Sequence, residues 1–301
     1  MRYIFFGTPQ FAAIILEKLI NNGFIPEAVV CNPDKPVGRK KIITPPPVKQ
    51  LITNLKAQSA IFQPENLSDV KSQLSKVNCQ IFIVAAYAQI IPKEILEIPR
   101  LGTIGVHPSL LPKYRGPTPI QTAILNGEEK TGVTLFLMDE KMDHGPIIRS
   151  EKLVMSNEET TETLTKKLAE LGAELLIEIL RKLGSPTSPK LTMRNIKEVG
   201  LPGIKLYPQD ESQATYTKKF STQDAYIEPL DLEKAQQAGG EIAIQIDRKI
   251  RALNPEPGTW TLRQAQGKPK RVKILEAKLT PEGKLKLKKI QFEGKKPIEI
   301  Y

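Results

Sequence analysis

Residues 2–20 read RYIFFGTPQFAAIILEKLI and indicate the class of fold. They begin with a short apolar run, typical of a strand, that ends at Gly7. Thr8 and Pro9 then supply an N-cap and a first-turn proline for a helix that we expect to reach about Ile20. A strand, a tight turn and a helix in this order predict the first unit of an α/β domain.

Further continuous apolar runs occur at 27–31, 80–86, 103–106 and 133–137, with helix-compatible stretches between several of them. Strands that are buried on both faces and alternate with helices indicate a mainly parallel, Rossmann-like sheet. Ser156 or Asn157 can cap a long amphipathic helix that reaches Leu183 and carries leucines at 164, 168, 171, 175 and 176. We expect this helix to close the first domain.

The chain changes character after residue 184. Prolines and weak apolar periodicity follow, and the end of the chain holds short alternating segments, such as 272–274 and 285–290, separated by glycines. We therefore predict an α/β domain at 1–190, a linker at 191–206 and a small β-barrel (OB-like) domain at 207–301.

Composition restricts the partners and the compartment. The chain of 301 residues has a formal charge of +11, and residues 201–301 hold 19 Lys and Arg against 13 Asp and Glu, or +6 of that excess. Clustered basic residues favour a polyanion. The two cysteines, Cys31 and Cys79, lie in apolar runs typical of reduced, buried thiols. No run is long enough for a membrane span or a signal peptide, so we expect a cytoplasmic protein.

The segment most suggestive of chemistry is 104–116, IGVHPSLLPKYRG. A strand ends there and a proline-bracketed loop follows, at the edge of an open α/β sheet where ligands gather. The first strand–turn–helix has no glycine between Gly7 and Gly23. The three-glycine dinucleotide fingerprint is therefore absent and a nicotinamide cofactor is not expected.

Both histidines of the chain lie near such strand ends. His107 belongs to the segment above, and His144 follows Asp143 in the sequence MDHGP. An acid and an imidazole on separate loops at neighbouring strand ends could handle a proton, with the carboxylate orienting the ring. The alternative is a pair of structural histidines, and these residues alone do not exclude it.

These motifs together resemble the folate-dependent formyltransferase family. The resemblance rests on residues 107–116 (HPSLLPKYRG), 131–134 (TGVT) and 138–145 (MDEKMDHG). The segments 5–11 (FFGTPQF), 33–39 (PDKPVGR), 62–64 (FQP) and 250–258 (IRALNPEPG) resemble the branch that formylates methionyl-tRNA. The likeness implies an enzyme of translation initiation with 10-formyltetrahydrofolate as formyl donor and methionyl initiator tRNA as acceptor. It implies no metal, and we expect a monomer.

The resemblance also assigns roles to residues. It implies that Ser109, Leu110, Leu111 and Pro112 contact the folate, and that the run 82–87 forms another wall of its pocket. The alternative is a packed loop with two core leucines.

For catalysis, the family holds the developing oxyanion with an asparagine and a histidine, while an aspartate orients the histidine. His107 and Asp143 match the last two. Gly105 stands where the asparagine is expected, two residues before the histidine on the same strand face. Because glycine has no side-chain donor, three readings stay open: an impaired enzyme, a variant in which water or another side chain replaces the donor, and a protein kept for binding alone.

The basic loop 33–49 is either a solvated turn or a nucleic-acid contact. The resemblance implies that it approaches the acceptor arm of the tRNA and makes Arg39, Lys40 and Lys41 candidate RNA contacts. The lysines of the final strands are open to two readings as well, an RNA surface or protection of a sheet edge. The rival functions are a formyltransferase for a small amine, which would not require this basic loop, and a folate- or RNA-binding module without catalysis.

Overall fold

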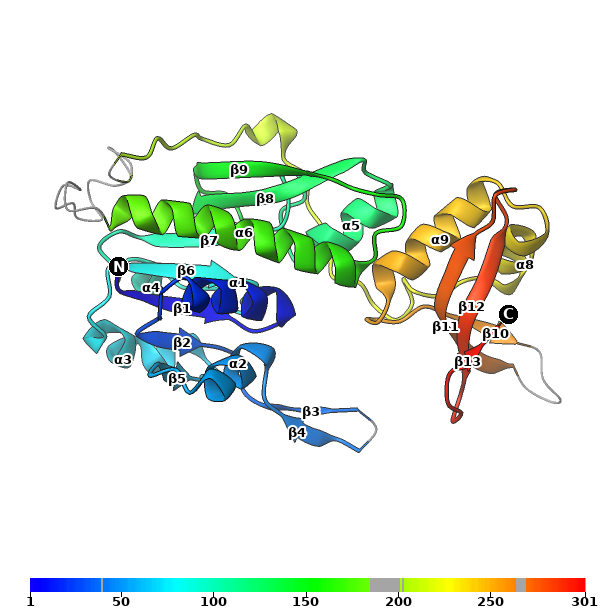
Figure 1. The fold of residues 1–301 in the computed structure, drawn as a ribbon, viewed down its shortest axis with the longest axis horizontal. Helices are drawn as coiled ribbons and strands as arrows, with labels where there is room; N and C mark the ends of the chain where they lie inside the picture. Colours follow the sequence, from blue (N-terminus) through cyan, green and yellow to red (C-terminus); the bar gives the residue numbers. More distant parts are fainter. Residues whose placement is uncertain (39, 185–200, 202, 264–268, 301) are drawn as a thin grey trace. The chain divides into compact units, whose positions relative to one another are not determined.

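The computed structural model describes residues 1–38, 40–184, 201, 203–263 and 269–300 (Figure 1). The chain divides into two compact units, and each contains several stretches of sequence. Unit 1 consists of Met1–Arg115, Gly132–Leu153 and Thr165–Tyr216, and unit 2 consists of Gly116–Thr131, Val154–Leu164 and Thr217–Tyr301.

Unit 1 is built on a seven-stranded sheet with the order β5-β2-β1-β6-β7-β8-β9. Its strands are β1 (Tyr3–Gly7), β2 (Ala28–Val30), β5 (Ala60–Phe62), β6 (Ile81–Ala85), β7 (Thr103–His107), β8 (Lys130–Leu137) and β9 (Ile147–Val154). The first five of these strands in sheet order are parallel, and β8 pairs antiparallel with β7. The apolar runs therefore form the predicted mainly parallel sheet. The carboxyl ends of its five parallel strands lie at one edge.

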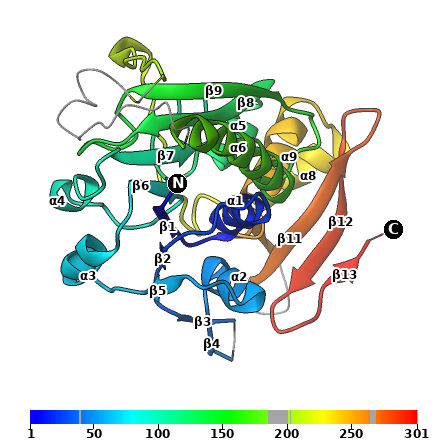
Figure 2. The same cartoon turned by 60° about the vertical axis from the view of Figure 1, so that its left-hand side comes forward.

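Helices cover both faces of this sheet (Figures 1 and 2). One face packs on η1 (Leu67–Val70), α3 (Lys71–Lys76) and α4 (Lys93–Leu96), with Phe6, Phe82 and Leu74 in the shared core. The other face carries α1 (Gln10–Asn21) and α6 (Thr161–Leu183). At Gly172 of α6, a Cβ atom would touch Val106, Val133 and Ile15, so the helix lies close on β7, β8 and α1. The result is a three-layer domain.

The ends of two helices differ from expectation. Thr8 does not cap α1: Pro9 is the N-cap residue without a side-chain hydrogen bond, and the Thr8 hydroxyl instead accepts from the Asn32 amide at 3.2 Å. The long helix α6 begins at Thr161, later than the predicted cap at Ser156 or Asn157. The Ser156 hydroxyl instead accepts from the Glu158 amide, within a turn that precedes the helix.

The basic loop of unit 1 forms a two-stranded hairpin of β3 (Lys35–Val37) and β4 (Ile42–Thr44), followed by α2 (Pro47–Leu55). Lys49 holds its base, because the ammonium donates to both Asp34 oxygens, at 2.8 and 2.9 Å, and to Gln63 Oε1 at 2.7 Å. These hydrogen bonds lower the pKa of Asp34, with Lys49 as the main cause and Gln63 next. The hairpin therefore projects from an ion-paired base.

Unit 2 contains a four-stranded antiparallel sheet with the order β10-β11-β12-β13. Its elements are α5 (Pro119–Asn126), α8 (Pro229–Gln237), α9 (Glu241–Leu253), β10 (Trp260–Arg263), β11 (Lys270–Leu279), β12 (Leu285–Phe292) and β13 (Ile298–Glu299). The core of this unit packs Ile274 and Leu285 of the sheet against Leu232 of α8 and Ile246 and Ile250 of α9. The small β domain predicted from the alternating segments is this sheet with its helices.

The compact units do not follow the predicted boundaries of 1–190, 191–206 and 207–301. Most of the predicted linker lies outside the described residues. Residues 207–216 pack within unit 1, where Tyr207 pairs with Ile147 through backbone hydrogen bonds of 2.7 and 2.9 Å. In the described ranges, no helix has the length and apolar character that a membrane span needs.

Candidate active site

His107 lies at the carboxyl end of β7 with only 7% of its side chain exposed. Its Nε2 atom is 2.8 Å from the backbone carbonyl of Tyr114, and because a carbonyl only accepts, Nε2 carries the proton of this hydrogen bond. Its Nδ1 atom lies 3.6 Å from Oδ2 of Asp143. The ring is therefore oriented from one side by the loop that follows β7 and faces a carboxylate on the other.

Asp143 comes from the turn between β8 and β9. It adopts a positive φ of 50°, an uncommon backbone conformation for a residue with a side chain. The next residue, His144, forms a second acid–imidazole pair, with 2.6 Å between its Nδ1 and Oδ2 of Asp139. Each histidine therefore lies beside a carboxylate, and the more buried His107 faces Asp143.

Gly105 lies on the same strand as His107, directly opposite Phe136 of β8. A Cβ atom at residue 105 would overlap Cε1 and Cζ of Phe136 and lie 3.1 Å from Cγ of Met138. Gly105 does not have a positive φ. The space beside its Cα is therefore filled by a buried aromatic ring, and a larger residue at this position would meet packing rather than backbone strain.

The residues expected to hold the folate divide into two kinds. The Ser109 side chain is buried and its hydroxyl donates to the Lys113 carbonyl at 2.6 Å, while Leu111 is also buried. Leu110 and Pro112 are partly exposed. In this structure Ser109 and Leu111 stabilise the loop, and Leu110 and Pro112 are the members of the set with surface available to a ligand.

The run 82–87, expected to form a second wall of the folate pocket, also contains both buried and exposed residues. Phe82 is fully buried in the core, whereas Ala86 is exposed. The Tyr87 hydroxyl is buried without a hydrogen-bond partner among the described residues, and burial raises the pKa of Tyr87 to about 12. A buried hydroxyl that lacks a partner is suited to a ligand with hydrogen-bonding groups, such as a pterin.

Two of the candidate RNA contacts, Lys40 and Lys41, lie between β3 and β4. Lys40 and Lys41 are exposed, and Arg39 lies outside the described residues. Three apolar hairpin side chains are more than half exposed, namely Val37, Ile42 and Ile43. Lys49, by contrast, is used inside the protein by Asp34 and Gln63. The hairpin therefore offers both cations and apolar surface to a partner.

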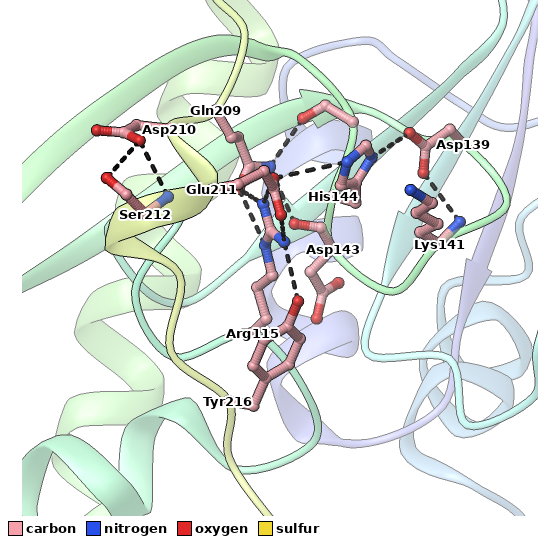
Figure 3. Close-up of polar contacts among 11 residues, drawn as sticks. Arg115, Asp139, Lys141, Asp143, His144, Gln209, Asp210, Glu211, Ser212 and Tyr216 are labelled. Carbon is pink, nitrogen blue, oxygen red and sulfur yellow. Dashed lines mark hydrogen bonds and ion pairs between the residues drawn. The ribbon is translucent and has the colours of Figure 1, made fainter.

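A polar network that sequence reasoning missed surrounds Asp143 (Figure 3). Arg115, whose side chain is 1% exposed, donates to Glu211 at 2.6 and 3.0 Å and to Oε1 of Gln209 at 2.7 and 3.1 Å. The hydrogen bonds between Arg115 and Glu211 raise the pKa of Arg115 and lower that of Glu211. The sequence holds no local signal for them, because the partners are more than 90 residues apart in the chain.

The comparisons with known proteins agree with these observations. The family model "Formyl transferase" matches residues 1–180, and "Formyl transferase, C-terminal domain" matches residues 241–284. A curated protein of Caldicellulosiruptor saccharolyticus, named methionyl-tRNA formyltransferase, is 37% identical over 98% of this chain and 93% of its own. One from Kosmotoga olearia with the same name is 36% identical over 100% and 95%.

Among solved structures, the fold is similar to that of methionyl-tRNA formyltransferase from Clostridium thermocellum. The TM-score is 0.61 at 19% identity, and the match covers 99% of each chain. At this identity the likeness concerns the fold alone.

Proposed function

The chain belongs to the formyl transferase family, and we propose that it transfers the formyl group of 10-formyltetrahydrofolate to the α-amino group of methionyl-tRNA. The observation that carries this proposal is identity of 36–37% over nearly the whole chain to proteins named for that reaction. The buried His107, with a carboxylate 3.6 Å from its ring, supports it on chemical grounds.

The reaction forms one bond and breaks another at the formyl carbon. The uncharged amine attacks this carbon, and the carbonyl oxygen gains negative charge in a tetrahedral species. The bond to the folate nitrogen then breaks, that nitrogen takes up a proton, and the new amide loses the proton of the former amine. His107 and Asp143 are the groups that we assign to moving these protons.

Gly105 removes the side-chain donor that the family resemblance places two residues before the histidine. Loss of one oxyanion donor typically lowers turnover by about 100- to 1000-fold. Among the described residues, the apolar Phe136 ring occupies the space beside Gly105. We therefore propose a slow enzyme that lacks a side-chain donor at residue 105 and depends on the His107–Asp143 pair.

The charge of unit 2 supports RNA as the partner. Lys278 and Lys286 are exposed and directly opposite each other on β11 and β12, and Lys278 forms an ion pair of 3.0 Å with Glu158. Strand β13 pairs with β12 only at Lys289 and Ile290, so an RNA surface and protection of a sheet edge both stay open as readings of the β12 lysines. The exposed lysines of this sheet are cations that a polyanion could contact.

We predict that binding of methionyl-tRNA weakens steeply as salt rises. For about three phosphate contacts, affinity should fall about 40-fold between 50 and 200 mM salt, because the release of counterions from the RNA is less favourable at higher salt. Filter binding of labelled tRNA to the full chain measures this slope. Affinity that is independent of salt would contradict an RNA-binding role for the lysines.

The hairpin tip gives a separate prediction. Replacing Lys40 and Lys41 together by alanine should raise KM for methionyl-tRNA by about tenfold, as expected from loss of one or two charged contacts, and leave folate affinity unchanged. Arg39→Ala is expected to act in the same way. The matched control replaces Lys71 and Lys76, two exposed lysines of α3. Equal loss of folate binding in the hairpin variant would mean that the hairpin supports the fold instead.

The experiment that tests the function is rapid mixing of the full chain with 10-formyltetrahydrofolate and one acceptor at a time. Methionyl-tRNA should be formylated, and free methionine, an amino sugar nucleotide and glycinamide ribonucleotide should not. Formylation of a small amine in preference to methionyl-tRNA would select the rival enzyme. Binding of folate and tRNA without any formyl transfer would select the binding module.

A further inference from the structure

Residues 207–216, which we call the strap, run along the active-site end of unit 1. The strap begins at Tyr207, paired with Ile147 at the start of β9, and ends at Tyr216, whose hydroxyl accepts from Arg115 at 3.1 Å. The strap lies more than 60 residues after the loop of Asp143 in the sequence. Its side chains nevertheless contact the loop that carries Asp143 (Figure 3) and the loop that follows His107.

Gln209 of the strap holds the loop of Asp143. Its Nε2 donates to the carbonyls of Asp143, at 2.9 Å, and Gly145, at 2.8 Å. Its Oε1 accepts from Arg115. Because the oxygen and the amino group of this amide both have hydrogen-bond partners, the amide has one orientation, with the oxygen toward the guanidinium and the amino group toward the loop. The backbone on both sides of His144 is therefore held, including the residue with positive φ, Asp143.

Arg115 anchors the strap. Its side chain is almost fully buried, and such a cation is stable only with charged or hydrogen-bonding partners. Three strap residues are among those partners: Gln209, Glu211 and Tyr216. Glu211 also lies 3.6 Å from Nε2 of His144, whose other ring nitrogen faces Asp139. The anchor and the Asp143 loop thus form one connected network.

Thr215 of the strap reaches the other half of the site. Its hydroxyl accepts from the Tyr114 amide at 2.8 Å, and its carbonyl accepts from the Arg115 amide at 2.8 Å. Tyr114 has a positive φ of 60°, and its carbonyl accepts the hydrogen bond from His107. Thr215 therefore acts on His107 through the backbone of Tyr114.

We propose that Gln209 and Thr215 are positioning residues that hold the two members of the His107–Asp143 pair in register. Gln209 sets the carboxylate through the backbone of its loop, and Thr215 sets the imidazole through Tyr114. The inference rests on the proposed function, in which this pair serves formyl transfer. It predicts that neither residue contacts the substrates.

Four variants of the full chain test this role. Gln209→Met removes both the donor and the acceptor at nearly constant volume, and Gln209→Glu keeps an acceptor for Arg115 but loses the donor to the loop carbonyls. Thr215→Val removes the hydroxyl that accepts from Tyr114, and Thr215→Ser keeps it. The matched control is Gln213→Met, at an exposed strap residue.

Both Gln209 variants and Thr215→Val should lower kcat by about 10- to 100-fold, because a small displacement of a reacting group has effects of this size. KM for methionyl-tRNA and for 10-formyltetrahydrofolate should not change. Thr215→Ser and Gln213→Met should match the parent. If Gln209→Glu keeps the kcat of the parent while Gln209→Met loses it, the proposed role of the loop carbonyls is wrong, because Gln209→Glu keeps only the contact with Arg115.

Imidazole NMR gives a readout that does not depend on activity. The chain has two histidines, so the spectrum of His107→Ala assigns both rings. The His107 signal should move in Gln209→Met and Thr215→Val and stay in place in Gln213→Met. A lower melting temperature with an unmoved His107 signal would show that the strap only supports the fold, and would overturn the proposal. If the parent forms no formylmethionyl-tRNA but the signal moves, the proposed function fails and the positioning role stands.

Discussion

Replacing His107 by alanine should lower kcat for formylation of methionyl-tRNA by about 100- to 10,000-fold, the usual range for a group that transfers protons. The ring is buried, donates to Tyr114 and faces Asp143, so its loss removes the partner of the carboxylate and half of the pair that we assign to proton transfer. KM should change little, since these interactions are made mainly in the transition state. Single-turnover mixing measures the rate of the chemical step.

The comparison variant for this experiment is His144→Ala. His144 is partly exposed and pairs with Asp139 rather than Asp143, so its loss should lower kcat much less than the loss of His107. Turnover equal to that of the parent in His107→Ala would show that the buried imidazole takes no part in the reaction. The binding module would then be the better description of the chain.

The second large effect concerns the missing donor at residue 105. Gly105→Asn alone should not raise turnover, because its Cβ would overlap the Phe136 ring. Forcing extra atoms into a packed core typically destabilises by about 1 to 3 kcal/mol. Thermal unfolding of this variant should therefore show a lower melting temperature, with activity at or below that of the parent.

Space for the asparagine requires a smaller residue at position 136. The double variant Gly105→Asn with Phe136→Val should raise kcat by about 100-fold over the parent, the effect typical of one added oxyanion donor. Valine removes the two ring atoms that the new Cβ would meet and suits a strand. Folate affinity should stay unchanged.

Phe136→Val alone is the control for this pair, because it opens the space without adding a donor. It should be destabilised, with no gain in turnover. A folded double variant that binds folate normally and gains nothing would contradict the view that residue 105 faces the formyl oxygen. The same gain in Phe136→Val alone would assign the effect to the cavity instead.

Much of unit 1 follows from local sequence patterns. Apolar runs such as 80–86 become buried strands because a parallel sheet covered on both faces leaves no polar position along them. The loop after β7 and the turn after β8 could be predicted as strand ends from the runs. Because β8 is antiparallel, its turn starts beside the amino end of β7, and only the tertiary structure shows that Asp143 reaches His107. Gly105 could be recognised as a departure from the family, but Phe136, which occupies its space, could not. That contact depends on the antiparallel register of β7 and β8.

Other features depended on contacts between distant residues. The strap was predicted to begin the second domain, yet it packs in unit 1, where Gln209, Glu211 and Tyr216 bind the buried Arg115. Lys49 belongs to the basic loop 33–49, but Asp34 and Gln63 bind its ammonium.

The sequence by itself determined the class of fold and the family, because strand periodicity and motif spacing are local properties of the chain, and through the family resemblance it made His107 and Asp143 candidate site residues. Only the tertiary structure decided which carboxylate faces which imidazole, what fills the space beside Gly105 and which segment holds the site. These depend on pairings between residues 30 to 100 positions apart. No local pattern encodes such pairings, since each is chosen by the burial and hydrogen bonding of the whole unit.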